Sequence, residues 1–356
     1  MANKKKVLIV KIGAIGDVVR TLSLLNYLKE EEITWLCGKA VLPLLEKSGR
    51  KLRLLAVDEE KLFHGKFFER LGEIGKIWFK IAFRFFDRII VAHADWRYGI
   101  FSVFSFGKKK TFSHRLKKKN PVPGRPFESE YIRLAFDRPM ADFEAFNYPR
   151  IETELVQRLV FDQKKIVALA PGGAKNVLAD DDQRRWPVEF YAVLAEKLMA
   201  EDYLVLLTGA PSDLWTVPFF EKLPVANFIG RTGLLDLLAL FQKCDLVIAN
   251  DAGPLHLAVL VKTAVLGLFG PTDPRVVLGQ GVKKAEIFSL WKGKEMACAP
   301  CFDGRGFAEC KTKKCLLALS PEEVLKKAKA IVLEREKRVF PELSKGLGEI
   351  LVKSKH

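Results

Sequence analysis

The sequence predicts an α/β protein built from two doubly wound domains that face each other across a cleft. Short apolar runs alternate with helical patterns along most of the chain, which is typical of βαβ units and a parallel sheet. The alternation occurs in two successive series, and each series begins with an apolar strand followed by a glycine-containing loop. A chain of 356 residues is long enough for two domains with full cores.

The first series forms the predicted amino-terminal domain, residues 1–160. Its first helix is predicted to include Asp17, directly after the first glycine-containing loop. Its predicted strands cover residues 6–10, 33–37, 52–57 and 88–92.

The second series forms the predicted carboxy-terminal domain, residues 161–335, and residues 336–356 are expected to be a helical tail. The two domains are expected to join within the region 121–163, which is rich in proline, phenylalanine and charged residues. The predicted helices begin at Val188 and Leu234, and the predicted strands cover residues 166–170, 203–207, 227–229, 245–249 and 264–269.

Composition argues against a disordered or membrane-spanning chain. Apolar residues make up 49% and charged residues 29%, as in ordinary globular proteins. No apolar run approaches the ~20 residues that span a bilayer. Lys4, Lys5 and Lys6 lead directly into a short strand, so no signal peptide is expected. We therefore expect a soluble, cytoplasmic protein, and we expect it to be a monomer.

Positive charge is concentrated in the first half of the chain. The net charge is +16, and residues 1–160 hold 31 Lys and Arg against 19 Asp and Glu, a balance of +12. Such an excess suits an anionic partner: nucleic acid, a phosphorylated glycolipid or an acidic membrane surface. A lysine-rich proteome is the alternative explanation. No nucleic acid is expected, because the cations are not interleaved with a single-strand platform or recognition helix.

A strand-to-helix turn near residue 251 predicts a phosphate site. Such a turn aims free N–H groups and the positive end of a helix dipole at one point. Gly253 lets a ligand approach the backbone, and Pro254 suits the start of a helix. The next strand, 264–269, delivers a second polar loop to the same edge of the sheet, where ligands of open α/β sheets bind. The turn consists of Asp251, Ala252, Gly253, Pro254, Leu255 and His256.

The first loop, residues 11–17, predicts a second polar site at the opposing sheet edge. It lacks the G-x-G-x-x-G spacing of dinucleotide-binding loops, but Gly13 and Gly16 would let a ligand lie against the backbone. Asp17 would face the cleft and accept a proton from an attacking hydroxyl. Alternatively, Asp17 is only an N-cap.

Two further loops of the second domain are candidates for nucleotide contacts. Arg184 and Arg185 would grip a pyrophosphate through their guanidinium groups, or else form a solvated charge run paired with the neighbouring aspartates. Thr208 and Gly209 close the predicted strand 203–207 and would contact a base or ribose. Many loops of this kind bind nothing.

These four loops, in this order, resemble the family 9 glycosyltransferases, the bacterial heptosyltransferases of lipopolysaccharide core assembly. The matching pieces are KIGAIGDVV, RRWP for the [KR]-x-W-P element, and NDAGPLHLA followed by LFGPTDP. The resemblance spans roughly residues 6–330. It implies a GT-B fold, with the acceptor mainly on the first domain and the nucleotide sugar mainly on the second.

The resemblance also implies roles for individual residues. Asp17 would be the general base of an inverting transfer from ADP-heptose to a hydroxyl of a lipopolysaccharide inner-core acceptor. Arg184, where the family usually has Lys, would neutralise the departing diphosphate, and residues 251–256 would bind it. No catalytic metal or other cofactor is implied, because helix dipole and Arg stabilise the leaving group. Another nucleotide sugar, a protein acceptor or a non-catalytic scaffold are the alternatives.

Three departures from the family pattern bear on the donor. Ala252 replaces a Ser or Thr and leaves the phosphate turn with backbone donors alone. Ser23 stands where the family often has Pro, and the approach to Arg184 is unusually acidic.

Four cysteines, Cys298, Cys301, Cys310 and Cys315, predict a structural site with the pattern C-x2-C-x8-C-x4-C. Four thiolates suit tetrahedral zinc or iron. Two disulfides are the competing interpretation, although a reducing cytoplasm opposes them. The resemblance to the family is compatible with a metal here, because certain protein-modifying heptosyltransferase relatives hold iron with cysteines.

Two stretches of the first domain are candidates for binding an acceptor or a membrane. The lysines and arginine of the first, Lys108, Lys109, Lys110, Arg115 and Lys117, would attract the phosphates of a glycolipid, or else form a solvated loop. The second, residues 63–86, interleaves aromatic and basic side chains and would contact the inner membrane face peripherally. Packing of its aromatic face on the sheet is favoured, and Gly72 and Gly75 argue against one long helix.

Overall fold

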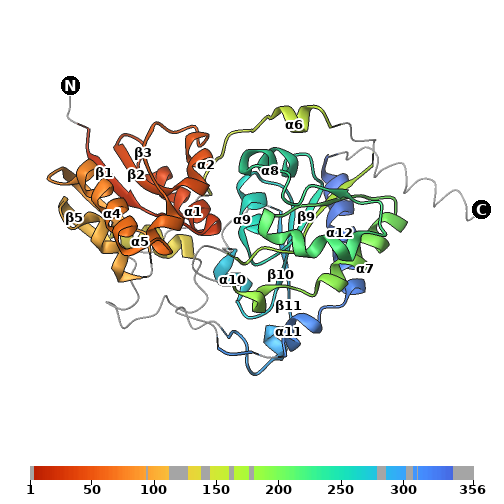
Figure 1. Cartoon of the computed structure of the whole chain (residues 1–356). Helices are drawn as coiled ribbons and strands as arrows, with labels where there is room; N and C mark the ends of the chain where they lie inside the picture. The colour runs from red at the N-terminus through yellow and green to blue at the C-terminus, as the bar shows by residue number, and fades with distance from the viewer. Residues whose placement is uncertain are drawn as a thin grey trace, which may run out of the picture.

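The computed structural model describes residues 4–93, 95–111, 127–137, 145–159, 164–175, 180–278, 286–301, 308–310 and 312–339. It contains two α/β domains side by side, each with a parallel sheet flanked by helices (Figure 1). No helix in these ranges is both long enough and apolar enough to cross a bilayer.

The described part of the amino-terminal domain has a parallel sheet in the order β3-β2-β1-β4-β5. The central strand β1 is buried after its first residue, because helices cover both faces of the sheet. The strands are β1 (Lys6–Val10), β2 (Glu32–Gly38), β3 (Leu52–Val57), β4 (Phe85–Val91) and β5 (Phe106–Thr111). The helices are α1 (Ile15–Thr21), α2 (Leu42–Glu46), α3 (Glu59–Phe63), α4 (Phe67–Ile81) and α5 (Phe127–Phe136), with shorter turns η1 (Leu22–Tyr27), η2 (Lys39–Val41) and η3 (Trp96–Ser102).

The described part of the carboxy-terminal domain has a parallel sheet in the order β11-β10-β9-β6-β7-β8. Its strands are β6 (Ile166–Ala170), β7 (Leu204–Leu207), β8 (Ala226–Asn227), β9 (Leu246–Asn250), β10 (Val265–Phe269) and β11 (Ile287–Trp291). Its helices are α7 (Val188–Ala200), α8 (Leu234–Phe241), α9 (Gly253–Leu260), α10 (Pro274–Val277), α11 (Lys314–Leu317) and α12 (Pro321–Val339), with turns η4 (Asp182–Arg184), η5 (Pro211–Phe220) and η6 (Gly293–Glu295). The short helix α6 (Glu154–Gln157) precedes this domain.

The predicted fold is confirmed: both series of strands form parallel sheets with helices between them. The prediction missed β5, whose sequence is half charged and does not look like a buried strand, and it also missed the short edge strand β11. The doubt about one helix through Gly72 and Gly75 was wrong, since α4 continues through both glycines. Residues 336–339 continue α12, and the rest of the expected tail lies outside the described residues.

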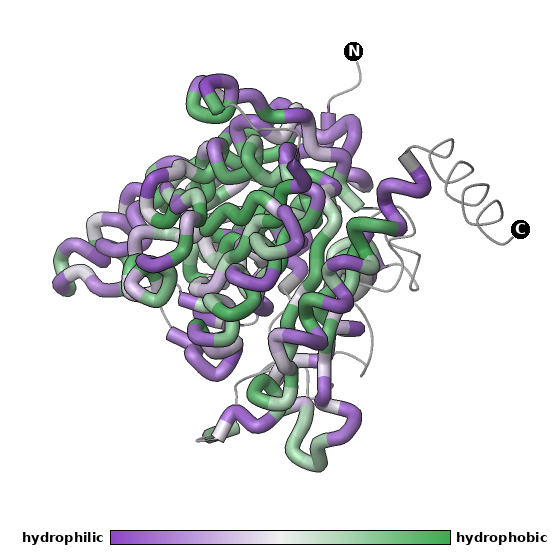
Figure 2. Tube along the Cα trace, turned by 90° about the vertical axis from the view of Figure 1, so that its right-hand side faces the viewer, coloured by the Kyte–Doolittle hydropathy of each residue, from purple (hydrophilic) through white to green (hydrophobic). Residues whose placement is uncertain are grey.

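Hydropathy follows the layers of each domain. Hydrophobic residues occupy the inner segments, and the surface helix α12 alternates between hydrophobic and hydrophilic positions (Figure 2). Val324, Ala328, Ile331 and Val332 are the buried members of that alternation, and their spacing is that of one helix face.

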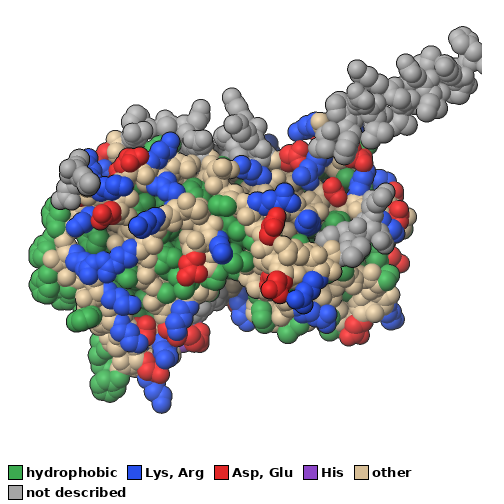
Figure 3. All heavy atoms as spheres, turned by 90° about the horizontal axis from the view of Figure 1, so that it is seen from above, with side chains coloured by type: hydrophobic (Ala, Val, Ile, Leu, Met, Phe, Trp, Pro, Cys, Tyr) green, Lys and Arg blue, Asp and Glu red, His purple; other side chains and the backbone are tan. Residues whose placement is uncertain are grey.

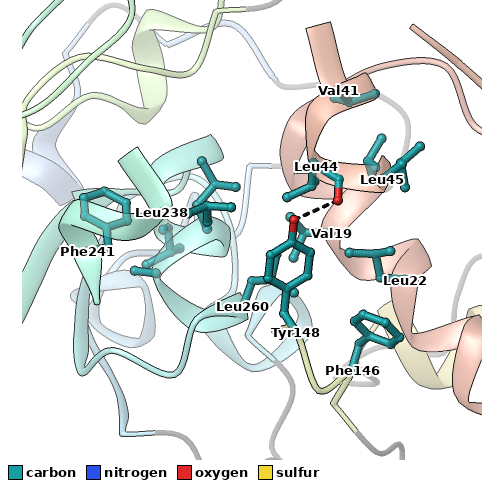
Figure 4. Close-up of a cluster of buried hydrophobic side chains, with 14 of the residues drawn as sticks. Val19, Leu22, Val41, Leu44, Leu45, Phe146, Tyr148, Leu238, Phe241 and Leu260 are labelled. Atoms are coloured by element: carbon teal, nitrogen blue, oxygen red, sulfur yellow. Dashed lines mark hydrogen bonds between the residues drawn. The ribbon is translucent and has the colours of Figure 1, made fainter. Parts of the chain in front are cut away.

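One hydrophobic cluster runs from the first domain into the second. Tyr148 and Phe146, from the segment that joins the domains, lie between Leu22 and Leu44 on one side and Leu260 on the other (Figure 4). The Tyr148 hydroxyl donates a hydrogen bond of 2.8 Å to the Leu44 carbonyl. The two domains are therefore in direct contact through buried apolar side chains.

Candidate functional site

The strand order of each sheet reverses next to β1 in the first domain and between β9 and β6 in the second. The loops after these strands lie where open α/β sheets bind ligands. The helices that follow β1 and β9, α1 and α9, begin next to each other. An added Cβ at Gly253 would lie 3.7 Å from Ile15, and one at Gly16 would clash with the His256 ring. The first loop and the turn at residue 251 therefore share one boundary between the domains.

Asp17 stands in the first turn of α1 and supplies a negative charge on the amino-terminal side of the site. Its Oδ2 is 2.8 Å from Lys11 Nζ, and its Oδ1 is 3.4 Å from Arg20 Nη1. Its side chain keeps 37% of its surface exposed. The alternative that Asp17 is the N-cap was wrong, because Ala14 holds that position.

The charge state of Asp17 is set by opposing effects. Burial raises the pKa of the carboxyl, but the Lys11 and Arg20 cations and the hydrogen bond from Lys11 outweigh it, so the pKa lies well below its ordinary value. The first turn of a helix also favours a negative charge. Asp17 is thus ionised throughout the range in which proteins are usually studied.

Lys11 and His93 support the first loop, and sequence reasoning missed both. Lys11 is almost fully buried directly after β1. The Ile12 N–H donates a 3.0 Å hydrogen bond to His93 Nε2, and the His93 ring stacks on Tyr98 with centroids 3.5 Å apart. Burial lowers the pKa of His93, and the Lys11 cation lowers it further. Both residues are polar and lie just past the end of a buried strand, and this position in the sequence could have indicated them as site residues.

Arg20 and His256 connect the two domains. Arg20 Nη2 lies 2.9 Å from His256 Nε2, and both side chains are buried. Because a guanidinium can only donate, Nε2 accepts and the imidazole is neutral. Burial and the Arg20 cation keep the pKa of His256 well below its ordinary value. His256 was predicted to lie near a donor, and here it contacts the opposite domain.

The predicted phosphate turn is built around Asp251. Its carboxylate accepts a 2.7 Å hydrogen bond from Thr272 Oγ1, and its carbonyl accepts one of 3.0 Å from Arg184 Nη1. Ala252 occupies the N-cap of α9 and has no side-chain acceptor for the first N–H groups. Gly253 and Pro254 begin α9, whereas Leu255 is fully buried behind them.

Arg184 and Arg185 point to different loops. Arg184 Nη2 forms a 2.8 Å ion pair with Asp181 and its Nη1 reaches the Asp251 turn. Arg185 pairs with Asp180 and donates 2.8 Å to the Gly173 carbonyl. Both arginines are therefore paired with neighbouring aspartates, as the alternative interpretation expected. Of the two, Arg184 also contacts the predicted phosphate turn.

Two buried polar residues that the sequence analysis missed join the loops of the second domain. Asn250 accepts from the Trp186 N–H at 2.9 Å and donates to the Gly172 carbonyl at 3.1 Å. Asp213 accepts from the N–H groups of Gly173 and Ala210, each at 2.9 Å. These bonds hold three loops at one edge of the sheet.

Three other predicted site residues have packing contacts. Gly13 lies under the Glu59 carboxylate, where a Cβ would clash. Thr208 is fully buried, and its hydroxyl donates 3.3 Å to the Leu169 carbonyl. Gly209 lies against Asp213.

The predicted basic surface lies at the outer edge of the first sheet. Lys108, Lys109 and Lys110 belong to the edge strand β5, so the interpretation of this segment as a loop was wrong. Lys108 and Lys110 form ion pairs with Asp137 at 3.4 and 2.6 Å. Arg115 and Lys117 lie outside the described residues.

The four clustered cysteines are all free thiols in this structure. Cys298 is exposed and Cys315 buried. Cys301 donates to the Cys298 carbonyl at 3.1 Å, and burial together with the other three cysteines raises its pKa. The described residues contain no group of three or more His, Cys, Asp or Glu arranged to hold a metal ion.

Comparison with known proteins gives a consistent family. The model of Glycosyltransferase family 9 (heptosyltransferase) matches residues 127–305, half of the chain. The lipopolysaccharide core heptosyltransferase OpsX of Haemophilus influenzae is 26% identical over 291 residues, covering 76% of this chain and 80% of OpsX.

Solved structures share the fold. E. coli ADP-heptose lps heptosyltransferase II aligns with a TM-score of 0.65 at 18% identity, covering 93% of this chain and 99% of the other. E. coli heptosyltransferase WaaC with ADP-2-deoxy-2-fluoro heptose aligns at 0.63 and 14%, covering 91% and 99%. The iron-containing dodecameric glycosyltransferase TibC of enterotoxigenic E. coli aligns at 0.57 and 10%, covering 95% and 77%. With two parallel-sheet domains of the GT-B type and these matched motifs, the chain belongs to glycosyltransferase family 9, the heptosyltransferases.

Proposed function

We propose that this glycosyltransferase transfers a heptose from ADP-heptose to a hydroxyl of a lipopolysaccharide inner-core acceptor, with inversion at the anomeric carbon. One observation carries the proposal: the Asp17 carboxylate and the start of α9 lie on opposite sides of one domain boundary. The names of OpsX, a lipopolysaccharide core heptosyltransferase, and of WaaC with an ADP-heptose analogue support the choice of acceptor and donor.

The second domain would bind the diphosphate of the donor. The first N–H groups of α9 and the positive end of its dipole suit phosphate oxygens. Arg184 reaches this turn from η4 and would stabilise the negative charge that develops as the leaving group departs. The loops at Gly13, Gly16, Thr208 and Gly209 complete the proposed donor site. This electrostatic stabilisation requires no catalytic cofactor.

The first domain would supply the base. The acceptor oxygen attacks the anomeric carbon, the bond to the diphosphate breaks, and Asp17 receives the hydroxyl proton. The contacts with Lys11 and Arg20 make Asp17 a weak base as it stands. A bound diphosphate would compete for these cations, and Asp17 would become more basic only when the donor is present.

Replacement of Asp17 by Asn tests this proposal. Asn keeps the shape of the side chain but cannot accept the proton, so kcat should fall by ~10²-fold or more. Affinity for ADP, measured by calorimetry, should change by less than about threefold. Glu189→Gln removes a comparable charge from an exposed position on α7 and should leave kcat unchanged. Turnover of Asp17→Asn within threefold of the parent would remove Asp17 as the base.

The nature of the donor is tested independently. A ligand that binds only the native state raises its melting temperature. Among ADP-, GDP- and UDP-sugars, only the ADP-sugars should stabilise the protein by several degrees. A larger shift with another nucleotide would move the proposal to that donor, and transfer to a protein would replace the glycolipid acceptor.

For the acceptor, we propose that Lys108, Lys109, Lys110, Arg115 and Lys117 attract its anionic groups, with the protein acting as a cytoplasmic monomer. Lys108 and Lys110 are already paired with Asp137, so this attraction would act over a distance and depend on ionic strength. A KM for acceptor that does not change with salt would contradict this assignment.

For the cysteine segment, we propose a structural zinc or iron held by Cys298, Cys301, Cys310 and Cys315. The four-thiol donor set suits these metals, and TibC is described as iron-containing. The described thiols are not arranged to share an ion as they stand, so binding would have to rearrange this segment. Elemental analysis of purified protein should give about one zinc or iron per chain, and a metal-free protein with two disulfides by mass spectrometry would refute the proposal.

A further inference from the structure

Helix α4 places one face on the sheet and leaves phenylalanines on the other. Glu73, Ile77 and Ile81 recur every four residues and are buried. Phe68 and Phe79 are 82% and 91% exposed. They stand eleven residues apart, which is three turns, so both rings project from the same side of the helix at a spacing of roughly 16 Å. The expectation that the aromatic side of this segment packs on the sheet was therefore wrong for these two residues.

The exposed rings continue from α4 onto the neighbouring strand ends. Phe83 is 80% exposed, and Phe85 pairs with Phe106 where β4 and β5 begin. Together they form what we call the phenylalanine face: Phe67, Phe68, Phe79, Phe83, Phe85, Phe104 and Phe106. Single exposed apolar residues are normal in soluble proteins, but a contiguous group marks an interaction surface.

Basic side chains surround the phenylalanine face. Seen from above, hydrophobic side chains and Lys or Arg side chains alternate over the outer end of the amino-terminal domain (Figure 3). Within residues 66–84 the cations are Lys66, Arg70, Lys76, Lys80 and Arg84. The acidic side chains of this stretch interact with residues of the same stretch. Glu69 accepts a 2.7 Å hydrogen bond from the Lys66 N–H, and buried Glu73 forms a 2.6 Å ion pair with Lys76. Lys80 and Arg84 form no ion pair with any described residue.

The positive charge around the phenylalanine face favours a lipid surface over a protein as its binding partner. Interfaces between proteins are depleted of lysine at their centres. The adjacent edge strand β5 carries Lys108, Lys109 and Lys110, and charged edges of this kind oppose pairing with another chain. Aromatic rings mixed with cations instead suit a lipid surface, where rings enter the boundary between headgroups and acyl chains and cations meet lipid phosphates.

We propose that the phenylalanine face docks the protein on an anionic bilayer. The rings at the start of β4 and β5 lie at the opposite end of the strands from Asp17, whose loop follows the end of β1. Docking led by these rings therefore leaves the boundary between the domains accessible, whereas Phe67 and Phe68 stand at the opposite end of α4. The inference explains how the enzyme would reach a lipid-anchored acceptor, and in that respect alone it rests on the proposed function.

Vesicle flotation of the full-length protein tests the proposal without donor or acceptor. The protein should bind vesicles of phosphatidylcholine with 30% phosphatidylglycerol and should bind pure phosphatidylcholine at least ~10-fold more weakly, because each nearby cation adds to attraction by anionic lipid. Raising the salt concentration should weaken binding. Absence of binding to the anionic vesicles at low salt would overturn the proposal.

Two pairs of variants separate the rings from the charges. Phe68→Ser with Phe79→Ser should weaken binding by ~20-fold or more, because two exposed rings lose their burial in lipid. The exposed Leu333→Ser on α12 is the control and should have no effect. Lys80→Glu with Arg84→Glu should weaken binding by ~10-fold, whereas Lys222→Glu with Lys243→Glu changes the net charge equally on the other domain and should do so by less than about threefold.

Gly75 allows a test by gain of function. It lies on the exposed side of α4 between Phe68 and Phe79, and no described atom would be within 4 Å of an added Cβ. Gly75→Leu should strengthen vesicle binding about fivefold, and Gly75→Glu should weaken it, although both residues favour the helix over Gly. Equal binding by the two variants would overturn the proposal. So would a dimer in analytical ultracentrifugation that Phe79→Ser dissociates, since a second copy would then cover this face.

Activity separates this inference from the function proposed above. The Phe68→Ser, Phe79→Ser variant should retain transfer to a soluble, delipidated acceptor while losing vesicle binding. Failure of the ADP-heptose assignment would leave the vesicle result intact, and failure of vesicle binding would leave transfer to the soluble acceptor intact.

Discussion

The starts of α1 and α9 are equivalent points in two similar domains, yet they carry opposite chemistry. The first turn of α1 holds a carboxylate between two cations, Lys11 and Arg20. The first turn of α9 holds no charged side chain and presents backbone donors beside Arg184. Under the proposed function, the same strand-to-helix unit would therefore supply a base on one side and an anion site on the other, because the side chains around the two helix starts differ.

The contrast between the starts of α1 and α9 depends on Arg184 being part of the proposed anion site. Arg184→Ala should lower kcat/KM by ~10²- to 10³-fold, because the departing diphosphate loses a preorganised cation. Steady-state kinetics with varied donor would measure this loss. Arg185→Ala removes the same charge from a side chain that turns toward Gly173 and should cost less than about fivefold. Similar losses in both variants would show that charge near the site matters more than the direction of Arg184.

Close approach of the two helix starts depends on Gly16. Gly16→Ala should weaken the contact between the domains, because its Cβ would meet the buried His256 ring. We expect a loss of ~1 to 3 kcal/mol in unfolding free energy, as for other overpacked sites. Urea denaturation would measure it. Gly72→Ala, on an open side of α4, should be neutral or stabilising, and a stable Gly16→Ala protein would show that the helices can separate without cost.

The buried histidines on the two sides of the boundary make stability depend on pH. The pKa values of His93 and His256 are lower in the folded protein than the ordinary 6.5. The unfolded chain therefore binds more protons below that pH, so stability is highest above pH 6.5 and falls on acidification. Protonation of these two residues in the unfolded chain should lower the free energy of unfolding by about 1 kcal/mol between pH 7 and pH 6. Denaturant titrations at both pH values would show it.

His256→Gln sharpens this prediction, since Gln cannot gain a proton but can still accept from Arg20. The pH dependence between 7 and 6 should fall by about half in that variant. An unchanged dependence would assign the effect to other groups.

The smallest expected effect concerns the missing hydroxyl at the N-cap of α9. Ala252→Ser should raise unfolding stability by ~0.5 to 1 kcal/mol, because a Ser side chain accepts from the first turn of the helix. It should also change donor affinity by a few fold, because the hydroxyl contacts the same N–H groups that the diphosphate would use. Calorimetry with ADP would measure this. No change in either quantity would mean that backbone donors at this turn are already satisfied.

The sequence predicts the sheets and the loops well, because strands buried on both faces leave continuous apolar runs. It predicts Asp17, Arg184 and the turn at Asp251 because each follows such a run or a helix-start signal. It did not indicate Arg20 paired with His256, since the two residues are 236 positions apart, Arg20 looks like an ordinary helix residue, and His256 was assigned to the phosphate turn alone. For the aromatic stretch 63–86 the sequence left two alternatives, packing on the sheet or contact with a membrane, because the spacing of apolar residues does not say which side of a helix meets the sheet when both sides carry them.

The joining segment around Tyr148 limits how the enzyme can open. Tyr148 is bonded to Leu44 of the first domain, and the Ile151 N–H donates 3.0 Å to Gln242 Oε1 of the second. The joining segment is hydrogen-bonded to both domains within four residues, so it would act as a hinge point and not as a flexible linker. Exchange of products for fresh substrates would then proceed by a small rocking of one half against the other about this point, with the far rim of the opening travelling most.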